Sequence, residues 1–306
     1  MDGADGFGHQ HAPPRQADER YLTAALGLLA AFLITEVVVA FASGSLALLS
    51  DAGHMLSDVG ALAGSLWAIR LAARPPRDKW TFGWKRAEIL SAAGNGITLV
   101  VVSGVVTVEA IRRLVTPPSV EGLPVIVVAG VGVGVNLAVT FVLARADRSS
   151  LNVRGAFAHI LTDLYGFVGT IVAGVVILAT GWTRADAIAS LLVVGLMLHA
   201  AWGLLRDSGR ILLEAAPEEI DLADIRSHLL AVDHIRDVHD LHVWTVTSNL
   251  PALSAHVVID DECFTDGHAP QLLDQVQHCL AGHFDVEHST FQLEPAGHTE
   301  HEPTGH

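Results

Sequence analysis

The stretch Ser50-Asp51-Ala52-Gly53-His54-Met55-Leu56-Ser57-Asp58 places ionisable side chains inside an apolar segment of the chain. Apolar runs lie on both sides of it, at 44–49 and 59–69. Ionisable groups at membrane depth are costly and usually have a function. His54 and Asp58 are four residues apart, so a helix presents both side chains on one face. This stretch therefore predicts a membrane helix that carries a functional site.

The same spacing recurs in His159-Ile160-Leu161-Thr162-Asp163, again within an apolar segment. One imidazole and one carboxylate from each of two helices supply four ligands, the number that a tetrahedral zinc ion takes. Two interhelical ion pairs are the alternative, but burying two carboxylates needs strong compensation. We therefore predict a metal site formed by His54, Asp58, His159 and Asp163.

The composition separates an apolar part of the chain from an acidic part. Of the 306 residues, 51% are hydrophobic and 17% are charged. In soluble domains about a quarter of all residues are charged. Residues 1–207 contain 15 acidic and 15 basic side chains, but residues 208–306 contain 18 acidic and 3 basic ones and 12 of the 17 histidines. We expect a membrane domain followed by a soluble domain that attracts cations and not nucleic acid.

Six apolar segments are each long enough to span a bilayer, which takes about 20 residues. Their approximate bounds are 21–42, 46–71, 86–113, 122–144, 153–181 and 185–206. The second and fourth connections carry nine Lys and Arg side chains, whereas the opposite side of the membrane has three, so the positive-inside rule places both termini in the cytoplasm. We expect a multi-pass protein of the plasma (inner) membrane, in contact with lipid and without a cleavable signal peptide.

Beyond residue 207 the pattern changes to that of a small α+β domain. Helical spacing at 221–232 and 269–283 is combined with strand-like alternation at 238–247, 252–260 and 286–294, and 248–251 forms a turn. This order is typical of a layered α+β fold. The two cysteines, Cys263 and Cys279, lack a Cys-x-x-C spacing, so we expect reduced thiols.

We divide the chain into four parts. These are a flexible cytoplasmic tail (1–20), a six-helix membrane domain (21–207), a cytoplasmic metal-binding domain (208–295) and a second tail (296–306). The tails contain histidines that either stay solvated or collect metal weakly: His9, His11, His298, His301 and His306.

Other polar residues of the membrane segments have less specific interpretations. Glu36 lies in the middle of the first segment and could relay protons or line a water-filled cavity. Asn95 and Asn136 are expected to hydrogen-bond between helices. Asp51 and Asp147 lie near helix ends, where capping or solvation is the default expectation.

A second group of metal-ligand residues lies in the predicted strands of the soluble domain. His239 and His242 are three residues apart, so alternation points them to opposite faces and they should not share an ion. His288 and Glu294 are six apart and share a face. By donor type, these strands predict a zinc site from His239, His256, His288 and Glu294.

Four stretches match one known family: residues 44–58, Thr81-Phe-Gly-Trp-Lys-Arg-Ala-Glu88, residues 152–163 and Val238-His-Asp-Leu-His-Val-Trp244. The chain resembles the cation diffusion facilitator family, and most closely its bacterial zinc-efflux members. The paired His-x-x-x-Asp motifs are the most specific part of this resemblance, which extends over most of the chain.

The resemblance implies a homodimeric six-helix transporter with a ferredoxin-like cytoplasmic domain, which exports Zn²⁺ in exchange for protons. It implies that the four intramembrane residues bind the transported ion, and that His in place of Asp at position 54 favours zinc over cadmium. It also implies a structural salt bridge between Arg86 and Glu214, and it assigns the cytoplasmic site to the same four residues as donor type does. The connection after the second segment offers Asp78 but no histidine, so the additional metal site of some members is not expected there.

Zinc binds neutral imidazoles and ionised carboxylates, so zinc and protons compete for one site. Alternating access would then give antiport without ATP, in agreement with the lack of a Walker A motif. We also expect zinc to act as a regulatory ligand of the acidic domain that favours a transport-competent packing of the dimer.

Other functions remain open at this point. An enzyme is not expected: an intramembrane metalloenzyme could use zinc ligands on helices, but the sequence has no His-Glu-x-x-His motif and no spare general base beside the site. A metal-sensing membrane protein that does not transport is a second alternative. Manganese, cobalt, nickel or cadmium could replace zinc as the substrate, because the same ligand types accept those ions.

Overall fold

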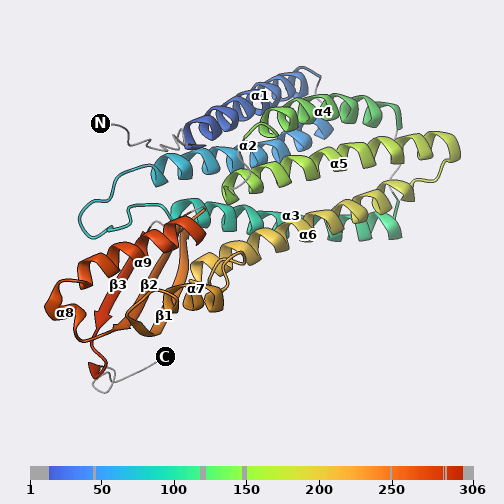
Figure 1. The fold of residues 1–306 in the computed structure, drawn as a ribbon. Helices are drawn as coiled ribbons and strands as arrows, with labels where there is room; N and C mark the ends of the chain where they lie inside the picture. The colour runs from blue at the N-terminus through green and yellow to red at the C-terminus, as the bar shows by residue number, and fades with distance from the viewer. Residues whose placement is uncertain are drawn as a thin grey trace, which may run out of the picture.

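The computed structural model describes residues 14–43, 46–117, 122–146, 150–248, 250–284, 286 and 288–298. Over these residues, a bundle of six long helices is joined to a smaller α+β domain at one end of the bundle (Figure 1). The fold class expected from the sequence is confirmed.

The bundle helices are α1 (Pro14–Ser43), α2 (Leu46–Ala72), α3 (Ala87–Val115), α4 (Gly122–Leu143), α5 (Leu151–Thr180) and α6 (Arg184–Leu212). Each overlaps one predicted segment. Helix α1 begins at Pro14, earlier than expected, so residues 14–20 belong to a helix and not to a flexible tail. Proline suits the first turn of a helix because its missing N–H would have no partner there.

Among the described residues, four helices are long and apolar enough to cross a membrane. They are α1 over Glu19–Val39, α3, α5 and α6. Large apolar side chains such as Phe41, Val101 and Trp202 are exposed on the outside of the bundle, as expected where lipid is the surrounding medium. The chain is a membrane protein.

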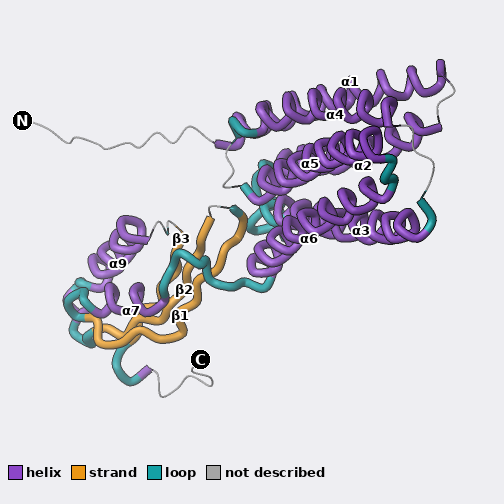
Figure 2. The backbone as a smooth tube through the Cα atoms, turned by 90° about the vertical axis from the view of Figure 1, so that its right-hand side faces the viewer, coloured by secondary structure: helices purple, strands orange, loops and turns teal. Residues whose placement is uncertain are grey.

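The bundle has two packed parts. Helices α1, α2, α4 and α5 share an apolar core that includes Leu22, Leu62 and Ile160. Helix α3 packs beside α6 (Figures 1 and 2), and a Cβ at Gly96 of α3 would lie 2.9 Å from the Leu205 side chain of α6. The small residue therefore allows these two helices to approach closely.

The α+β domain contains α7 (Leu222–Leu230), β1 (Ile235–Thr247), β2 (Leu250–Ile259), the short α8 (Cys263–Asp266), α9 (Ala269–Phe284) and β3 (His288–Glu294). The strand order is β1-β2-β3, with β1 and β2 antiparallel and β2 and β3 parallel. Helices α7 and α9 cover one face of the sheet (Figure 2) and bury Ile225, Val257 and Val276 against it. The predicted order of helices and strands is confirmed, with α8 as an addition.

Candidate metal centres

The membrane cluster consists of Asp58 from α2 and of His159 and Asp163 from α5. His159 Nε2 lies 2.7 Å from Asp58 Oδ1 and 3.8 Å from Asp163 Oδ2. One ligand atom from each residue lies within 4.8 Å of the other two. Two carboxylates and one imidazole are donors that zinc accepts, so this cluster can bind a divalent cation.

The helical spacing explains how these side chains come together. His159 and Asp163 are one turn apart on one face of α5, and that face packs toward α2. His54 lies in α2 one turn before Asp58, but its side chain is outside the described part of the chain. The structure thus brings together Asp58, His159 and Asp163, and the part played by His54 remains a prediction.

A cavity of about 320 Å³ adjoins the membrane cluster. Asp58, His159 and Asp163 line it, together with side chains of α3 and α6. From the cluster, the lining continues along α5 as far as Thr170, and along α6 it includes Ala189. Both residues lie in the halves of their helices that are remote from the soluble domain. The cavity therefore extends from the metal donors toward the far end of the bundle.

On the side of the metal donors that faces the soluble domain, which we call the near side, a polar cluster of buried side chains joins three helices by hydrogen bonds. Asn95 Nδ2 of α3 donates to Ser65 Oγ of α2 at 3.0 Å, and Asn152 Nδ2 of α5 donates to the Ser65 carbonyl at 2.7 Å. Ser65 is seven residues after Asp58, and Asn152 is seven residues before His159, or about 10 Å along each helix. This cluster separates the metal donors from the soluble domain.

The prediction for Asn95 is confirmed, because its hydrogen bond joins two helices. The prediction for Asn136 is wrong in the described contacts, since its Nδ2 donates to the Gly132 carbonyl of its own helix at 3.2 Å. In a helix the carbonyl four residues earlier lies within reach of such a side chain, so Asn136 donates to a group of its own helix.

The cytoplasmic cluster consists of His239 on β1, His256 on β2 and Glu294 on β3. His239 and His256 are direct partners across the two strands. Glu294 Oε2 lies 3.2 Å from His239 Nε2, and Glu294 Oε1 lies 2.8 Å from His256 Nδ1. The Glu294 side chain is only 1% exposed, so a buried carboxylate faces two imidazoles. This donor set also fits zinc.

His288 does not belong to this cluster, and its prediction as a fourth ligand is wrong in this arrangement. It pairs with Ala252 at the other end of the β2–β3 ladder, whereas Glu294 pairs with Val258. Its ring packs against Phe82, with the ring centroids 5.7 Å apart. Alternation places His288 and Glu294 on one face, but six residues of strand separate them by about 20 Å.

Asp240 is a nearby carboxylate that the strand pattern does not identify. A register shift interrupts the β1–β2 ladder between His239 and His242, and Asp240 has a positive φ of 48° at this point. The bulge brings Asp240 Oδ1 to 3.0 Å from His242 Nε2 and its Oδ2 to 3.7 Å from His256 Nε2. Bulges re-aim side chains in this way and leave little trace in sequence alternation.

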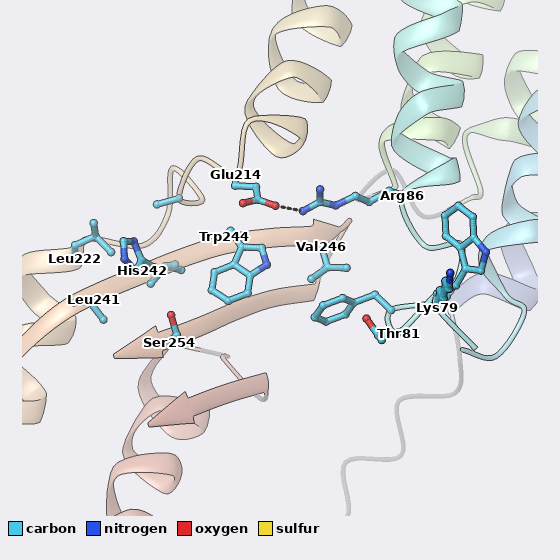
Figure 3. A pocket seen from close by; sticks show the side chains of 15 residues that line it. Lys79, Thr81, Arg86, Glu214, Leu222, Leu241, His242, Trp244, Val246 and Ser254 are labelled. Atoms are coloured by element: carbon cyan, nitrogen blue, oxygen red, sulfur yellow. Dashed lines mark hydrogen bonds and ion pairs between the residues drawn. The ribbon is translucent and has the colours of Figure 1, made fainter. Parts of the chain in front are cut away.

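The two domains meet around a cavity of about 770 Å³ (Figure 3). Arg86 Nη2 donates to Glu214 Oε1 at 2.7 Å across this junction, so the two residues expected to form a salt bridge are in contact. In the connection between α2 and α3, Trp80 and Trp84 stack with ring centroids 4.1 Å apart.

Both cysteines are free thiols. Burial, followed by the charges of neighbouring carboxylates, raises the pKa of Cys263, and burial raises that of Cys279. Protonated thiols are poor metal ligands. In the described residues, neither cysteine belongs to a metal-ligand cluster.

Comparison with known proteins agrees with this architecture. A model described as the cation efflux transmembrane domain matches residues 22–213, and one described as the cation efflux protein cytoplasmic domain matches residues 217–296. The chain is 42% identical to the zinc transporter ZitB of Escherichia coli over 291 residues, which are 94% of this chain and 91% of that protein.

Two further relatives extend the comparison. The chain is 38% identical to a Bacillus subtilis protein named cadmium, cobalt and zinc/H(+)-K(+) antiporter, over 95% of this chain and 93% of that one. Among solved structures, the metal-bound C-terminal domain of the CzcD transporter from Cupriavidus metallidurans matches at 35% identity. This match covers 24% of this chain and 99% of that domain, with a TM-score of 0.22.

Proposed function

The chain belongs to the cation efflux family, and on that premise we propose that it exports Zn²⁺ from the cytoplasm in exchange for protons. The observation that carries this proposal is the membrane cluster: Asp58, His159 and Asp163 place their ligand atoms within 4.8 Å of one another beside a cavity. Its relatives named as zinc transporters favour zinc as the ion. His54 would be the fourth ligand.

Proton coupling follows from the chemistry of these ligands. Imidazole ordinarily titrates at about pH 6.5 and aspartate at about pH 3.9. A proton on His159 removes the lone pair that would bind zinc, so protonation and zinc binding exclude each other. A site that faces an acidic exterior gains protons and releases zinc, and one that faces the cytoplasm loses them and binds zinc again. The cycle needs no ATP.

The cavity and the polar cluster support alternating access. The cavity extends from the metal donors toward the far end of the bundle, whereas Ser65, Asn95 and Asn152 hydrogen-bond on the near side. With the soluble domain in the cytoplasm, as the positive-inside rule predicts, this arrangement is closed toward the cytoplasm. We place the protein in the inner membrane in that orientation.

Zinc would also bind the cytoplasmic cluster as a regulatory ligand. His239, His256 and Glu294 would hold it, and it would supply a cross-link between three strands. The buried Glu294 carboxylate fits a cation, since an ionised group that is 1% exposed needs compensation for its burial. The homodimer implied by the family resemblance would be the transporting unit.

The test is zinc uptake into inside-out proteoliposomes with an imposed pH gradient. Wild type should take up zinc faster with the gradient than without it, and Asp163→Ala should abolish uptake. Asp78→Ala is the matched control, because Asp78 is an exposed aspartate remote from the cluster, and it should transport like wild type. Absence of flux for every divalent metal in wild type would refute the proposal and favour a metal sensor.

Other divalent cations are the second candidate substrates. The name of the Bacillus subtilis relative includes cadmium and cobalt as well as zinc. Nitrogen and oxygen donors accept all three ions. Competition of cadmium, cobalt, nickel and manganese with zinc uptake in the same vesicles decides between a zinc-selective and a broad exporter.

A further inference from the structure

The first turn of α3 contains a buried carboxylate that belongs to neither metal cluster. Glu88 is only 6% exposed, and three hydroxyl groups donate to it. Ser150 Oγ and Ser248 Oγ donate to Oε1 at 2.6 and 3.1 Å, and Thr247 Oγ1 donates to Oε2 at 3.0 Å. These hydrogen bonds, with the N-terminal dipole of α3, compensate the burial of a charge.

Two of these hydroxyls also cap the N-terminus of α5. Ser150 is the N-cap residue of α5, and its Oγ accepts from the Val153 N–H at 3.4 Å. Ser248 comes from the turn after β1, and its Oγ accepts from the Leu151 N–H at 3.1 Å. The first N–H groups of a helix have no partner within the helix. Because each hydroxyl donates its proton to Glu88, its oxygen lone pairs are free to accept from the first N–H groups of α5.

The contacts of Glu88 therefore join α3 to two elements that carry metal ligands, α5 and β1. Thr247 is the last residue of β1, the strand that carries His239, and Ser248 comes directly after it. Ser150 begins the helix that carries His159, which lies nine residues further on, or about 13 Å along the helix axis. A displacement of the N-terminus of α5 would be transmitted along a rigid helix to the metal donors.

We propose that Glu88 is a positioning residue that fastens the N-terminus of α5 to the turn between β1 and β2, and so holds His159 in register with Asp58. The effect on zinc rests on the proposed transport function. The effect on α5 does not, because it follows from the capping contacts alone. Arg86 and Glu214 form a separate link between the domains and cannot replace these contacts, since neither caps α5 in the described hydrogen bonds.

The first measurement is amide hydrogen exchange of the full-length protein in nanodiscs without zinc. Glu88→Gln should accelerate exchange at residues 151–154 by about tenfold, the effect expected from weakening one hydrogen bond to a charged group. Ser248→Ala should accelerate exchange at the same residues. Glu218→Gln is the control, because Glu218 is an exposed carboxylate that pairs with Arg206 and Arg210 of α6, and it should leave these amides unchanged.

The second measurement is the zinc concentration dependence of uptake in the same variants. A displaced α5 should raise KM by about tenfold in Glu88→Gln, with a smaller change in the maximal rate. The double variant Glu88→Gln/Ser248→Ala should be no worse than Glu88→Gln, because both changes act through one contact. A general loss of folding would instead lower the maximal rate and accelerate exchange across α3 and α6 as well.

The inference is overturned if exchange at residues 151–154 is the same in Glu88→Gln and wild type. It is also overturned if wild type transports zinc and the KM of Glu88→Gln is unchanged. If wild type transports no metal, the proposed function fails, and the exchange measurement still decides the role of Glu88.

Discussion

The membrane cluster and the cytoplasmic cluster use similar donors on different supports. Asp58 meets His159 and Asp163 from two separate helices beside a cavity, whereas His239, His256 and Glu294 project from three neighbouring strands joined by backbone hydrogen bonds. Helices that contact through side chains can shift relative to each other, but a hydrogen-bonded ladder fixes its register. The same chemistry is thus suited to a mobile site in one region and to a static site in the other.

The largest expected effect comes from removing one imidazole in each cluster. His159→Ala should reduce zinc flux on the order of 100-fold or more, because the site loses one of its direct ligands. His239→Ala should reduce flux less than about tenfold, since the role proposed for the cytoplasmic cluster is to regulate transport and not to carry the ion. Initial rates of zinc uptake in matched proteoliposomes measure both. Equal losses in the two variants would remove the distinction between a transport site and a regulatory site.

The next effect tests which residue of β3 binds zinc. Glu294→Gln should weaken zinc binding to the cytoplasmic cluster by at least about tenfold, because the buried carboxylate is lost. His288→Ala, at the other end of the same strand, should bind zinc like wild type. Competition with a fluorescent chelator measures both affinities in an Asp163→Ala background, which removes the membrane site. Weaker binding in His288→Ala would restore His288 as a ligand.

A smaller effect concerns ion selectivity in the mobile site. His54→Asp should raise the ratio of cadmium to zinc flux by about tenfold, since a carboxylate can bind bidentately and suits a larger ion with more oxygen ligands. The corresponding change His239→Asp should leave the flux ratio unchanged. Parallel uptake of both ions measures the ratio. An unchanged ratio in His54→Asp would show that position 54 does not select the ion.

The smallest effect concerns the stability of the α+β domain that holds the cytoplasmic cluster, in the absence of metal. Hydrogen bonds from Arg236 and His234 lower the pKa of Asp260, next to the end of β2. A carboxyl group whose pKa is lowered by folding stabilises the folded state at pH values above its ordinary pKa of about 4. This contribution is lost as the pH falls through the lowered pKa. Asp260→Asn should therefore lower the unfolding temperature slightly at pH 7.

The pH dependence provides the control for this last effect. The difference between Asp260→Asn and wild type should shrink in thermal scans as the pH falls below about 4, because the contribution of the ionised carboxylate is lost as the pH falls toward the lowered pKa of Asp260. A difference that stays constant with pH would contradict the charge-based explanation.

Periodicity in the sequence predicts the membrane cluster better than the cytoplasmic one. A four-residue spacing on a helix specifies both the face and the distance, so Asp163 follows from His159. A strand specifies only the face, so the pattern predicts His288 in the same site as Glu294 although the two lie at opposite ends of β3. The bulge at Asp240 also has no signature in the alternation.

The contacts of Glu88 show a different limit of sequence analysis. Its three partners come from the start of α5 and from the turn after β1, so they are far from it in the chain. Serine and threonine are common at turns and helix starts, and nothing in their local pattern indicates a shared carboxylate. Only the packing of the two domains brings them together.

Zinc/proton antiport through the membrane cluster is tested by simultaneous recording of zinc entry and proton exit in proteoliposomes without an imposed pH gradient. Fluorescent indicators inside the vesicles report both ions. Inward zinc flux should alkalinise the lumen in wild type, and Asp163→Ala should abolish both signals while Glu218→Gln retains them. Zinc entry without a proton signal in wild type, or zinc entry that persists in Asp163→Ala, would contradict an antiporter that uses this cluster.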